Sequence, residues 1–302
     1  MKRVLSLKRC LRLSAWLVIS MALGLPAAAD EPVIAHEQMV VAANPHASEA
    51  GIRILREGGS AVDAAIAVQL VLSMVEPQSS GIGGGAFLLH AETSGDRVDV
   101  TAYSGRETAP RAAGPDMFVS DDTGPGAFAS LMYGGLPIGV PGVMRMLEMA
   151  HADHGLLPWA DLFAPAIELA ESGFEISPRL YFLLDRAASS ARAERFRAHY
   201  FDEAGNALVT GTRLVNPEYA DTLRLLAAEG ADAMYTGSLA REIVAHINDN
   251  AVSDGYMTLE DLAAYRPEKL EAIAKTTEVE DLLSRGERWA GFIEAPEQAE
   301  LV

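Results

Sequence analysis

Two histidines and an aspartate near the middle of the chain are residues whose types suggest a metal site. His151 and His154 stand three positions apart with Asp153 between them, and imidazole and carboxylate groups are common zinc ligands. The pair falls at the expected end of a helix, and no third ligand is in view, so we expect these side chains to be solvated. The sequence predicts no metal site.

A glycine-rich segment, residues 79–85, could bind an anion, because consecutive glycines let backbone N–H groups point at a ligand. Close packing of the backbone at the start of a strand explains the same glycines, and we favour it. Ser79 and Ser80 have no nearby histidine or lysine that could act as a base, which argues against a serine nucleophile. The segment follows a helix and precedes a strand, so it is not a dinucleotide fingerprint. We expect no cofactor.

The beginning of the chain has the pattern of a secretory signal peptide. Basic residues up to Arg12 precede an apolar run, Leu13 to Leu25, that is shorter than the ~20 residues needed to span a bilayer. Ala27 and Ala29 supply the small residues of a cleavage site. We therefore expect residues 1–29 to be removed, a periplasmic or secreted mature protein, and no membrane segment after cleavage.

The chain is strongly acidic, with 42 Asp and Glu against 24 Lys and Arg and a net charge of −18. The leader carries five of the basic residues and none of the acidic ones, so its removal changes the net charge to −23. Such a field repels phosphate backbones, and we expect no nucleic-acid partner. Cys10, the only cysteine, lies in the leader, so we expect no disulfide and no thiolate metal site in the mature protein.

The elements that must position these residues begin with a short apolar run and two helices. Residues 39–43 have the pattern of a buried strand, and Asn44 is expected to turn the chain and cap a helix over residues 46–56. Ser60 and Asp63 have the spacing of a capping box, which predicts a second helix that ends near residue 76.

Strands come next, and helices dominate the rest of the chain. Residues 86–90 and 98–103 predict a hairpin whose turn lies at 93–96. A loop rich in glycine, proline and aspartate follows over residues 111–135. Further helices are expected at residues 142–154, 159–171, 178–199, 218–229, 238–250 and 258–265. Strands and helices do not alternate after residue 110, so the pattern predicts an α+β fold, helix-rich after residue 140, and not a doubly wound sheet.

Several motifs occur in an order that resembles the gamma-glutamyltransferase family of N-terminal-nucleophile hydrolases. They cover about residues 38–266, and a series of motifs in one order is more specific than any single match. The motifs are MVVA (residues 39–42), GGSAVDAA (58–65), VEPQSSGIGGG (75–85), GRETAP (105–110), YGG with GVPG (133–135 and 139–142), residues 162–173 and TLEDL (258–262).

The resemblance implies a four-layer αββα sandwich and a precursor that cuts itself into a large and a small subunit. The new N-terminal threonine of the small subunit is then the nucleophile that attacks a gamma-glutamyl bond, as in glutathione. This chain resembles the large subunit. Its GRETAP motif implies that Arg106 binds the alpha-carboxylate of the glutamyl group, which suits the bidentate geometry of a guanidinium. Without the motif, Arg106 would be a surface arginine after a strand.

Beyond residue 266 the resemblance is expected to fail. Residues 267–275 have the pattern of an amphipathic helix, and residues 267–302 are treated as an acidic tail outside the large-subunit-like domain of residues 30–266. Thr276 and Thr277 precede Glu278 and not the expected histidine, so we assign no catalytic residue to this chain. We expect the small subunit to be absent from it, and sheet strands without partners to make the chain prone to aggregation.

Three interpretations stay open at this point. The chain is the large subunit of a gamma-glutamyl hydrolase or transferase whose small subunit is encoded separately, and it is inactive alone. Alternatively, it is a truncated product without enzymatic activity. In the third interpretation it belongs to a related acylase of beta-lactam side chains, although Arg106 favours a substrate with an alpha-carboxylate.

Overall fold

The computed structural model describes residues 34–95, 97–118, 134–187, 194–249, 253–271, 274–276, 292–293 and 299–301. The expected leader and Thr277 lie outside these residues, so what the sequence predicts for them stays a prediction. The chain divides into two compact parts, residues 1–39 and 40–302, and the helices and strands described lie in the second. In the described part of the chain, no helix is long and apolar enough to cross a membrane.

An antiparallel hairpin forms most of the main sheet, as the sequence predicts. β1 (Ala86–Ser94) pairs along its whole length with β2 (Arg97–Gly105), and Ala86 lies opposite Gly105 at the open end. Gly95 in the turn has a φ of +63°, in the left-handed region that glycine adopts without steric cost. The hairpin therefore positions the end of β2 beside the start of β1, and the next residue follows directly from there.

A third strand joins this sheet where the residue pattern predicts a helix. β5 (Glu268–Glu271) pairs antiparallel with the second edge of β2, with Leu270 opposite Ala102, and β6 (Ala274–Thr276) follows it. The predicted helix over residues 267–275 is therefore wrong. The edge of β2 offers unpaired backbone groups that a strand satisfies, and this long-range pairing outweighs a short helical pattern.

The two helices before the hairpin begin at the predicted caps. The Asn44 side chain accepts a hydrogen bond from the N–H of His46 (3.1 Å) at the start of α2 (Pro45–Arg56). Ser60 and Asp63 form both hydrogen bonds of a capping box at the start of α3 (Ala61–Val75). The turn-and-cap role expected of Asn44 is confirmed.

Asp63 also links α3 to a loop far away in the sequence. Its carboxylate is buried, and Oδ2 accepts hydrogen bonds from the N–H groups of Leu156 (2.9 Å) and Leu157 (3.1 Å). One side chain thus caps a helix and fixes the segment that follows a later helix, which orients the two elements relative to each other.

The strand predicted over residues 39–43 is not formed. Residues 40–43 have no regular secondary structure, and the Val41 side chain is 84% exposed. No strand in the described part of the chain pairs with this run. A single extended segment without a hydrogen-bonded neighbour does not persist as a strand. The apolar pattern of residues 39–43 alone was therefore insufficient to predict a strand.

Helices account for most of the described residues after 140, as predicted. The segment 159–171 is a 3₁₀ helix followed by an α-helix, and the described residues of the segment 178–199 are helical in α7 (Pro178–Ala187) and α8 (Glu194–Tyr200). The remaining elements are α5 (Val143–His154), η1 (Trp159–Phe163), α6 (Ala164–Ser172), β3 (Phe174–Glu175), β4 (Arg213–Leu214), α9 (Pro217–Glu229), α10 (Asp232–Tyr235), α11 (Ser238–Asn248), α12 (Leu259–Ala264), β7 (Phe292–Ile293) and β8 (Ala299–Leu301).

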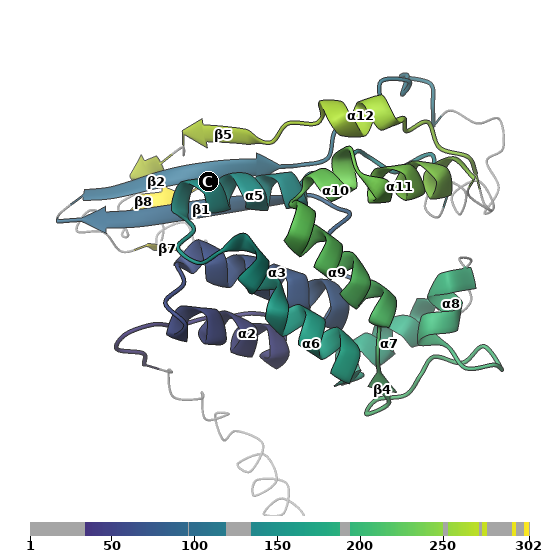
Figure 1. Ribbon diagram of the computed structural model, residues 1–302, viewed down its shortest axis with the longest axis horizontal. Helices are drawn as coiled ribbons and strands as arrows, with labels where there is room; N and C mark the ends of the chain where they lie inside the picture. Colours follow the sequence, from purple (N-terminus) through teal and green to yellow (C-terminus); the bar gives the residue numbers. More distant parts are fainter. Residues whose placement is uncertain are drawn as a thin grey trace, which may run out of the picture. The chain divides into compact units, whose positions relative to one another are not determined.

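The helices form a layer on one side of the hairpin. α5 packs against β2, α3 contacts α2, α5, α6 and η1, and α9 lies on α6 and η1. Figure 1 shows β5 alongside β2 and α12 next to α10 and α11, which it contacts. Fully buried side chains from three of these helices, Ile66, Leu70, Met144 and Phe163, form the centre of the core. The α+β class is confirmed.

Candidate substrate-binding site

Arg106 is the first residue beyond the hairpin. β2 ends at Gly105, so the Arg106 backbone has no partner in β1. Its side chain is 59% exposed; Nη1 lies 3.3 Å from Oε2 of Glu107, and the guanidinium carbon is 5.9 Å from the Phe87 ring centre. A guanidinium that is accessible to solvent and held beside a ring and a carboxylate can bind an anionic group bidentately.

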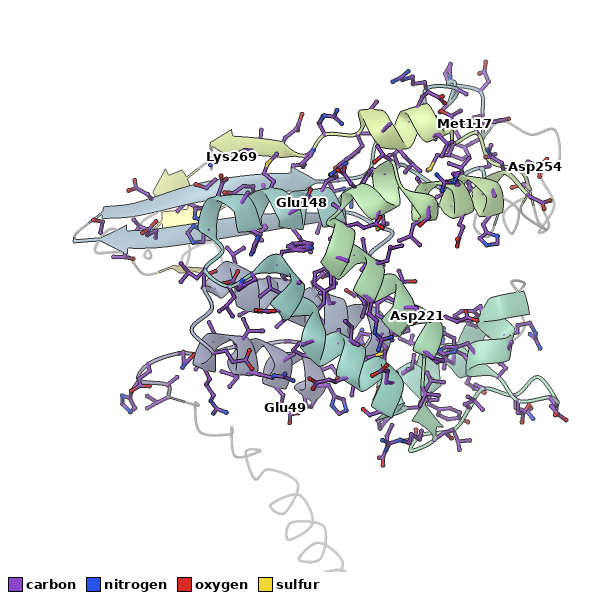
Figure 2. The ribbon with its side chains drawn as sticks, in the orientation of Figure 1. Glu49, Met117, Glu148, Asp221, Asp254 and Lys269 are labelled. Carbon is purple, nitrogen blue, oxygen red and sulfur yellow. The ribbon has the colours of Figure 1, made fainter. Side chains whose placement is uncertain are left out.

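A cavity of about 380 Å³ adjoins Arg106. Among the described residues, Arg106 and Glu107 are the charged ones that line it, and most of the described wall is apolar. Figure 2 labels Met117, which lies on this wall. The apolar wall consists of Ala109, Pro110, Ala113, Met117, Phe118, Leu136, Pro137 and Ile138.

The GVPG motif holds the GRETAP motif by backbone pairing and close contact. The N–H of Val140 donates to the carbonyl of Thr108 (2.8 Å), and the N–H of Thr108 donates to the carbonyl of Val140 (3.3 Å). A Cβ at Gly139 would lie 2.9 Å from Cβ of Glu107, so residue 139 must be glycine for the two segments to approach. The two motifs form one rigid unit.

The glycine-rich segment supports this unit from the other side, as the close-packing interpretation predicts. The Gly84 carbonyl accepts hydrogen bonds from the N–H groups of Gly142 (2.9 Å) and Val143 (3.1 Å) at the start of α5. A Cβ at Gly85 would collide with the Glu107 carboxylate and lie 2.7 Å from the Gly105 carbonyl. Packing accounts for Gly84 and Gly85, and the glycines bring the hairpin, α5 and Glu107 together.

Ser80 has a structural contact and no base. Its Oγ accepts a hydrogen bond from Nε2 of Gln69 (2.9 Å), a neutral amide that cannot remove a proton. The N–H groups of Ser79 and Ser80 both donate to the Glu76 carbonyl (3.0 Å each), which forms the turn after α3. These contacts place both serines in the turn that follows α3.

Two residues that the sequence did not link to Arg106 contact the segment that carries it. Oη of Tyr265 donates to the Arg106 carbonyl (2.8 Å), and Oδ1 of Asp261 accepts from the N–H of Arg111 (3.1 Å). The capping box of Thr258 and Asp261 was predictable from local spacing and is present. The second role of Asp261 was not predictable, because Arg111 is 150 residues away in the sequence.

Burial and hydrogen bonding act in opposite directions on Asp261. Burial alone would raise the pKa of this carboxyl. The hydrogen bonds from the Arg111 backbone and from Thr258 outweigh that effect, and the pKa of Asp261 lies below its ordinary value. The group is therefore an ionised hydrogen-bond acceptor at neutral pH.

Asp153 is exposed, as expected, whereas His151 and His154 are half-buried and have partners within the protein. Tyr103, which is fully buried, donates to Oδ2 of Asp153 (2.7 Å) and lies 2.8 Å from Nε2 of His154. Lys269 on β5 (Figure 2) pairs with the same carboxylate oxygen (2.8 Å), and together with Tyr103 it lowers the pKa of Asp153. Among the described residues, no group of histidine and carboxylate side chains could hold a metal ion.

Comparison with known proteins places this geometry in a family. The model of the family described as gamma-glutamyltranspeptidase matches residues 47–295, a range that extends beyond residue 266, where the resemblance was expected to end. The protein Glutathione hydrolase 3 of Arabidopsis thaliana is 36% identical over 243 residues. That alignment covers 80% of this chain and 36% of the relative, so the chain spans well under half of the relative's length.

Solved structures agree with the sequence comparison. The gamma-glutamyltranspeptidase of Helicobacter pylori superposes with a TM-score of 0.74 at 30% identity, over 80% of this chain and 68% of that one. A cephalosporin acylase from Bacillus halodurans superposes with a TM-score of 0.66 at 31% identity, over 83% of this chain and 47% of that one. The predicted fold class, part of an N-terminal-nucleophile hydrolase, is confirmed. This chain belongs to the gamma-glutamyltranspeptidase family.

Proposed function

We propose that this chain forms the part of a gamma-glutamyl hydrolase or transferase that binds the alpha-carboxylate of the substrate, with glutathione as the representative donor. Arg106 is the residue that binds it. The observation that carries the proposal is the position of Arg106, which combines an exposed guanidinium with a rigid backbone and an adjoining cavity. A bidentate guanidinium–carboxylate pair fixes the orientation of a ligand and also increases its affinity.

The nucleophile belongs, in this proposal, to a small subunit that complements this chain. A threonine hydroxyl of that subunit attacks the gamma-glutamyl carbonyl, the amine leaves, and water or an acceptor amine then takes the glutamyl group from the acyl-enzyme. Arg106 contributes by holding the far end of the glutamyl group, so that the carbonyl lies near the attacking oxygen. This chain alone is then inactive.

The charge of Glu107 also bears on how Arg106 binds a carboxylate. Its carboxylate lies against Gly85, and Oε2 is a buried atom without a hydrogen-bond partner in the described part of the chain, although it lies within ion-pair distance of Arg106. This negative charge lies at Nη1, on one side of the guanidinium. The substrate carboxylate then binds the remaining N–H groups of the guanidinium.

The proposal is tested with Arg106→Ala and Arg106→Lys, in this chain combined with a small subunit of the family. Loss of a bidentate charged contact should reduce kcat/KM for a gamma-glutamyl anilide about 100-fold or more in Arg106→Ala, and about tenfold in Arg106→Lys, which keeps the charge but not the two-pronged geometry.

Arg186→Ala is the matched control. Arg186 is also an exposed arginine close to a phenylalanine ring, at 5.4 Å from Phe182, but it lies on α7. It should leave kcat/KM unchanged. Equal activity of Arg106→Ala and the unaltered chain would refute the role of Arg106, and no activity with any small subunit would favour a product without enzymatic function.

A second candidate function rests on the likeness to the cephalosporin acylase. In this alternative the fold is kept, and the acyl group removed comes from a beta-lactam side chain. Arg106 argues for a glutamyl donor, because an alpha-carboxylate gives its guanidinium a partner. Comparing hydrolysis of a gamma-glutamyl anilide and of a cephalosporin by the same assembled protein decides between the two.

A further inference from the structure

The TLEDL motif and the tyrosine after it have no role in the proposed chemistry, yet they contact the segment that carries Arg106. This segment, residues 106–111, leaves the sheet at Gly105 and continues as a loop. A loop residue that must bind a ligand with defined geometry needs a backbone fixed by other elements. Three contacts provide that support.

The first contact is the hydroxyl of Tyr265. It donates to the Arg106 carbonyl (2.8 Å), and the Tyr265 side chain is only 4% exposed. Its ring stacks on Tyr235 at 5.8 Å, and Oη of Tyr235 donates to the Pro141 carbonyl (2.8 Å). The contact with Tyr235, itself held by its hydrogen bond to Pro141, therefore helps to hold the hydroxyl in place.

Gly142 gives the hydroxyl access to the Arg106 carbonyl. A Cβ at this position would overlap the Tyr265 hydroxyl and the Gly105 carbonyl. The glycine of the GVPG motif and the tyrosine after α12 are thus parts of a single arrangement around the end of β2.

The second and third contacts are Asp261 and Val140. Asp261 is 5% exposed; Oδ1 accepts from the Arg111 N–H (3.1 Å), and Oδ2 accepts from the N–H and hydroxyl of Thr258 (3.0 and 2.8 Å). Between the two ends, Thr108 pairs with Val140. The segment 258–265 therefore holds residues 106–111 at both ends.

We propose that Tyr265 and Asp261 are positioning residues for Arg106. They fix the backbone on both sides of the arginine, so that its guanidinium meets a carboxylate in one orientation. The inference that this orientation serves substrate binding rests on the proposed function, whereas the inference that the two residues immobilise the segment does not.

Amide hydrogen exchange in the full chain tests the immobilisation. Tyr265→Phe should increase the exchange rate of the Thr108 amide about fivefold to tenfold, the loss expected for one hydrogen bond, and Asp261→Asn should do the same for the Arg111 amide. Amides of α9 should be unaffected.

Tyr219→Phe and Asp63→Asn are matched controls. Oη of Tyr219 also donates to a backbone carbonyl, that of Leu70 (3.2 Å), and Asp63 is also a buried capping-box aspartate that accepts from distant backbone N–H groups. They should leave the amides of residues 106–111 unchanged. Unchanged exchange in Tyr265→Phe and Asp261→Asn, or equal increases in the controls, would overturn the proposal.

Binding of L-glutamate, measured by calorimetry on the same proteins, separates this inference from the proposed function. Tyr265→Phe should weaken the Kd about fivefold to tenfold, and Tyr219→Phe less than about twofold. If Arg106→Ala weakens binding and Tyr265→Phe does not, the positioning role is wrong. If Arg106→Ala binds L-glutamate as the unaltered chain does, the proposed function fails, and hydrogen exchange still decides whether the segment is immobilised.

Discussion

At the scale of single residues, His90 makes the stability of the hairpin sensitive to pH. Its ring stacks on His154 with 3.7 Å between centres. Burial, and then the charge of His154, lower the pKa of His90 below 6.5, while Glu92 acts weakly in the opposite direction. The unfolded chain then binds a proton more readily than the folded chain. Above pH 6.5 His90 is neutral in both states and does not reduce the free energy of unfolding. As the pH falls below 6.5, protonation of His90 in the unfolded chain should decrease the free energy of unfolding.

His90→Gln should flatten this dependence, as measured by urea unfolding between about pH 7.5 and 5.5. His199 serves as the comparison, because burial lowers its pKa as well and its ring lies on α8, away from the hairpin. His199→Gln should remove only the part of the pH dependence of unfolding that comes from His199. A His90→Gln profile that runs parallel to that of the unaltered chain would contradict the argument.

Residues with local partners were predictable, and residues with distant partners were not. The caps at Asn44, Ser60 and Thr258 follow from spacings of two or three residues, and all three are present. The contact of Tyr265 with Arg106 joins residues 159 positions apart. No local pattern encodes such a contact, because it depends on how β5 and α12 return to the hairpin.

At the scale of elements, Gly142 determines how closely α5, the end of β2 and α12 approach one another. Its backbone angles (φ −126°, ψ −19°) are accessible to alanine, so a substitution would act through overlap and not through backbone strain. Gly142→Ala should destabilise the protein by about 1–3 kcal/mol, the range for overpacking a tightly packed site. Thermal unfolding measures this effect.

Gly83→Ala is the control from the neighbouring glycine motif. A Cβ at Gly83 would meet no atom within 4 Å, so we expect little change in Tm. If Gly142→Ala is tolerated as well as Gly83→Ala, the three elements can separate without cost, and the close packing described here does not govern stability.

The errors among the predicted elements share one physical cause. Residues 39–43 were predicted as a strand and have no partner strand in the described part of the chain. Residues 267–275 were predicted as a helix, and β5 instead pairs with β2. In both cases the secondary structure depended on whether another strand was available for pairing. The periodicity of the sequence gives no information about such a distant partner.

At the scale of the whole molecule, one face of the main sheet is apolar and exposed. Phe87 (71% exposed), Leu89 (51%) and Leu270 (47%) lie on it, and β1 is an edge strand among the described residues. Such an exposed apolar face beside an open strand edge favours association between chains.

Leu89→Thr should increase the soluble fraction of the chain expressed alone and reduce its binding of a hydrophobic dye, because threonine keeps the strand propensity and removes apolar surface. Leu156→Thr, the same change at an exposed leucine in a loop, should have little effect. The argument fails if the two variants behave alike.

The fold class and the position of Arg106 after a strand followed from the order of the motifs and the hairpin pattern. The wall of the cavity did not, because Met117, Leu136 and Gly139 come from segments that only the folded chain brings together.

The hydrogen bond from Tyr265 to Arg106 also sets an order of events during synthesis. The arginine and the hairpin that precedes it leave the ribosome 159 residues before the tyrosine that anchors them. Until then, the Arg106 carbonyl lacks this hydrogen bond. The backbone at Arg106 is therefore held from this side only after the helices from α5 to α12 have been made.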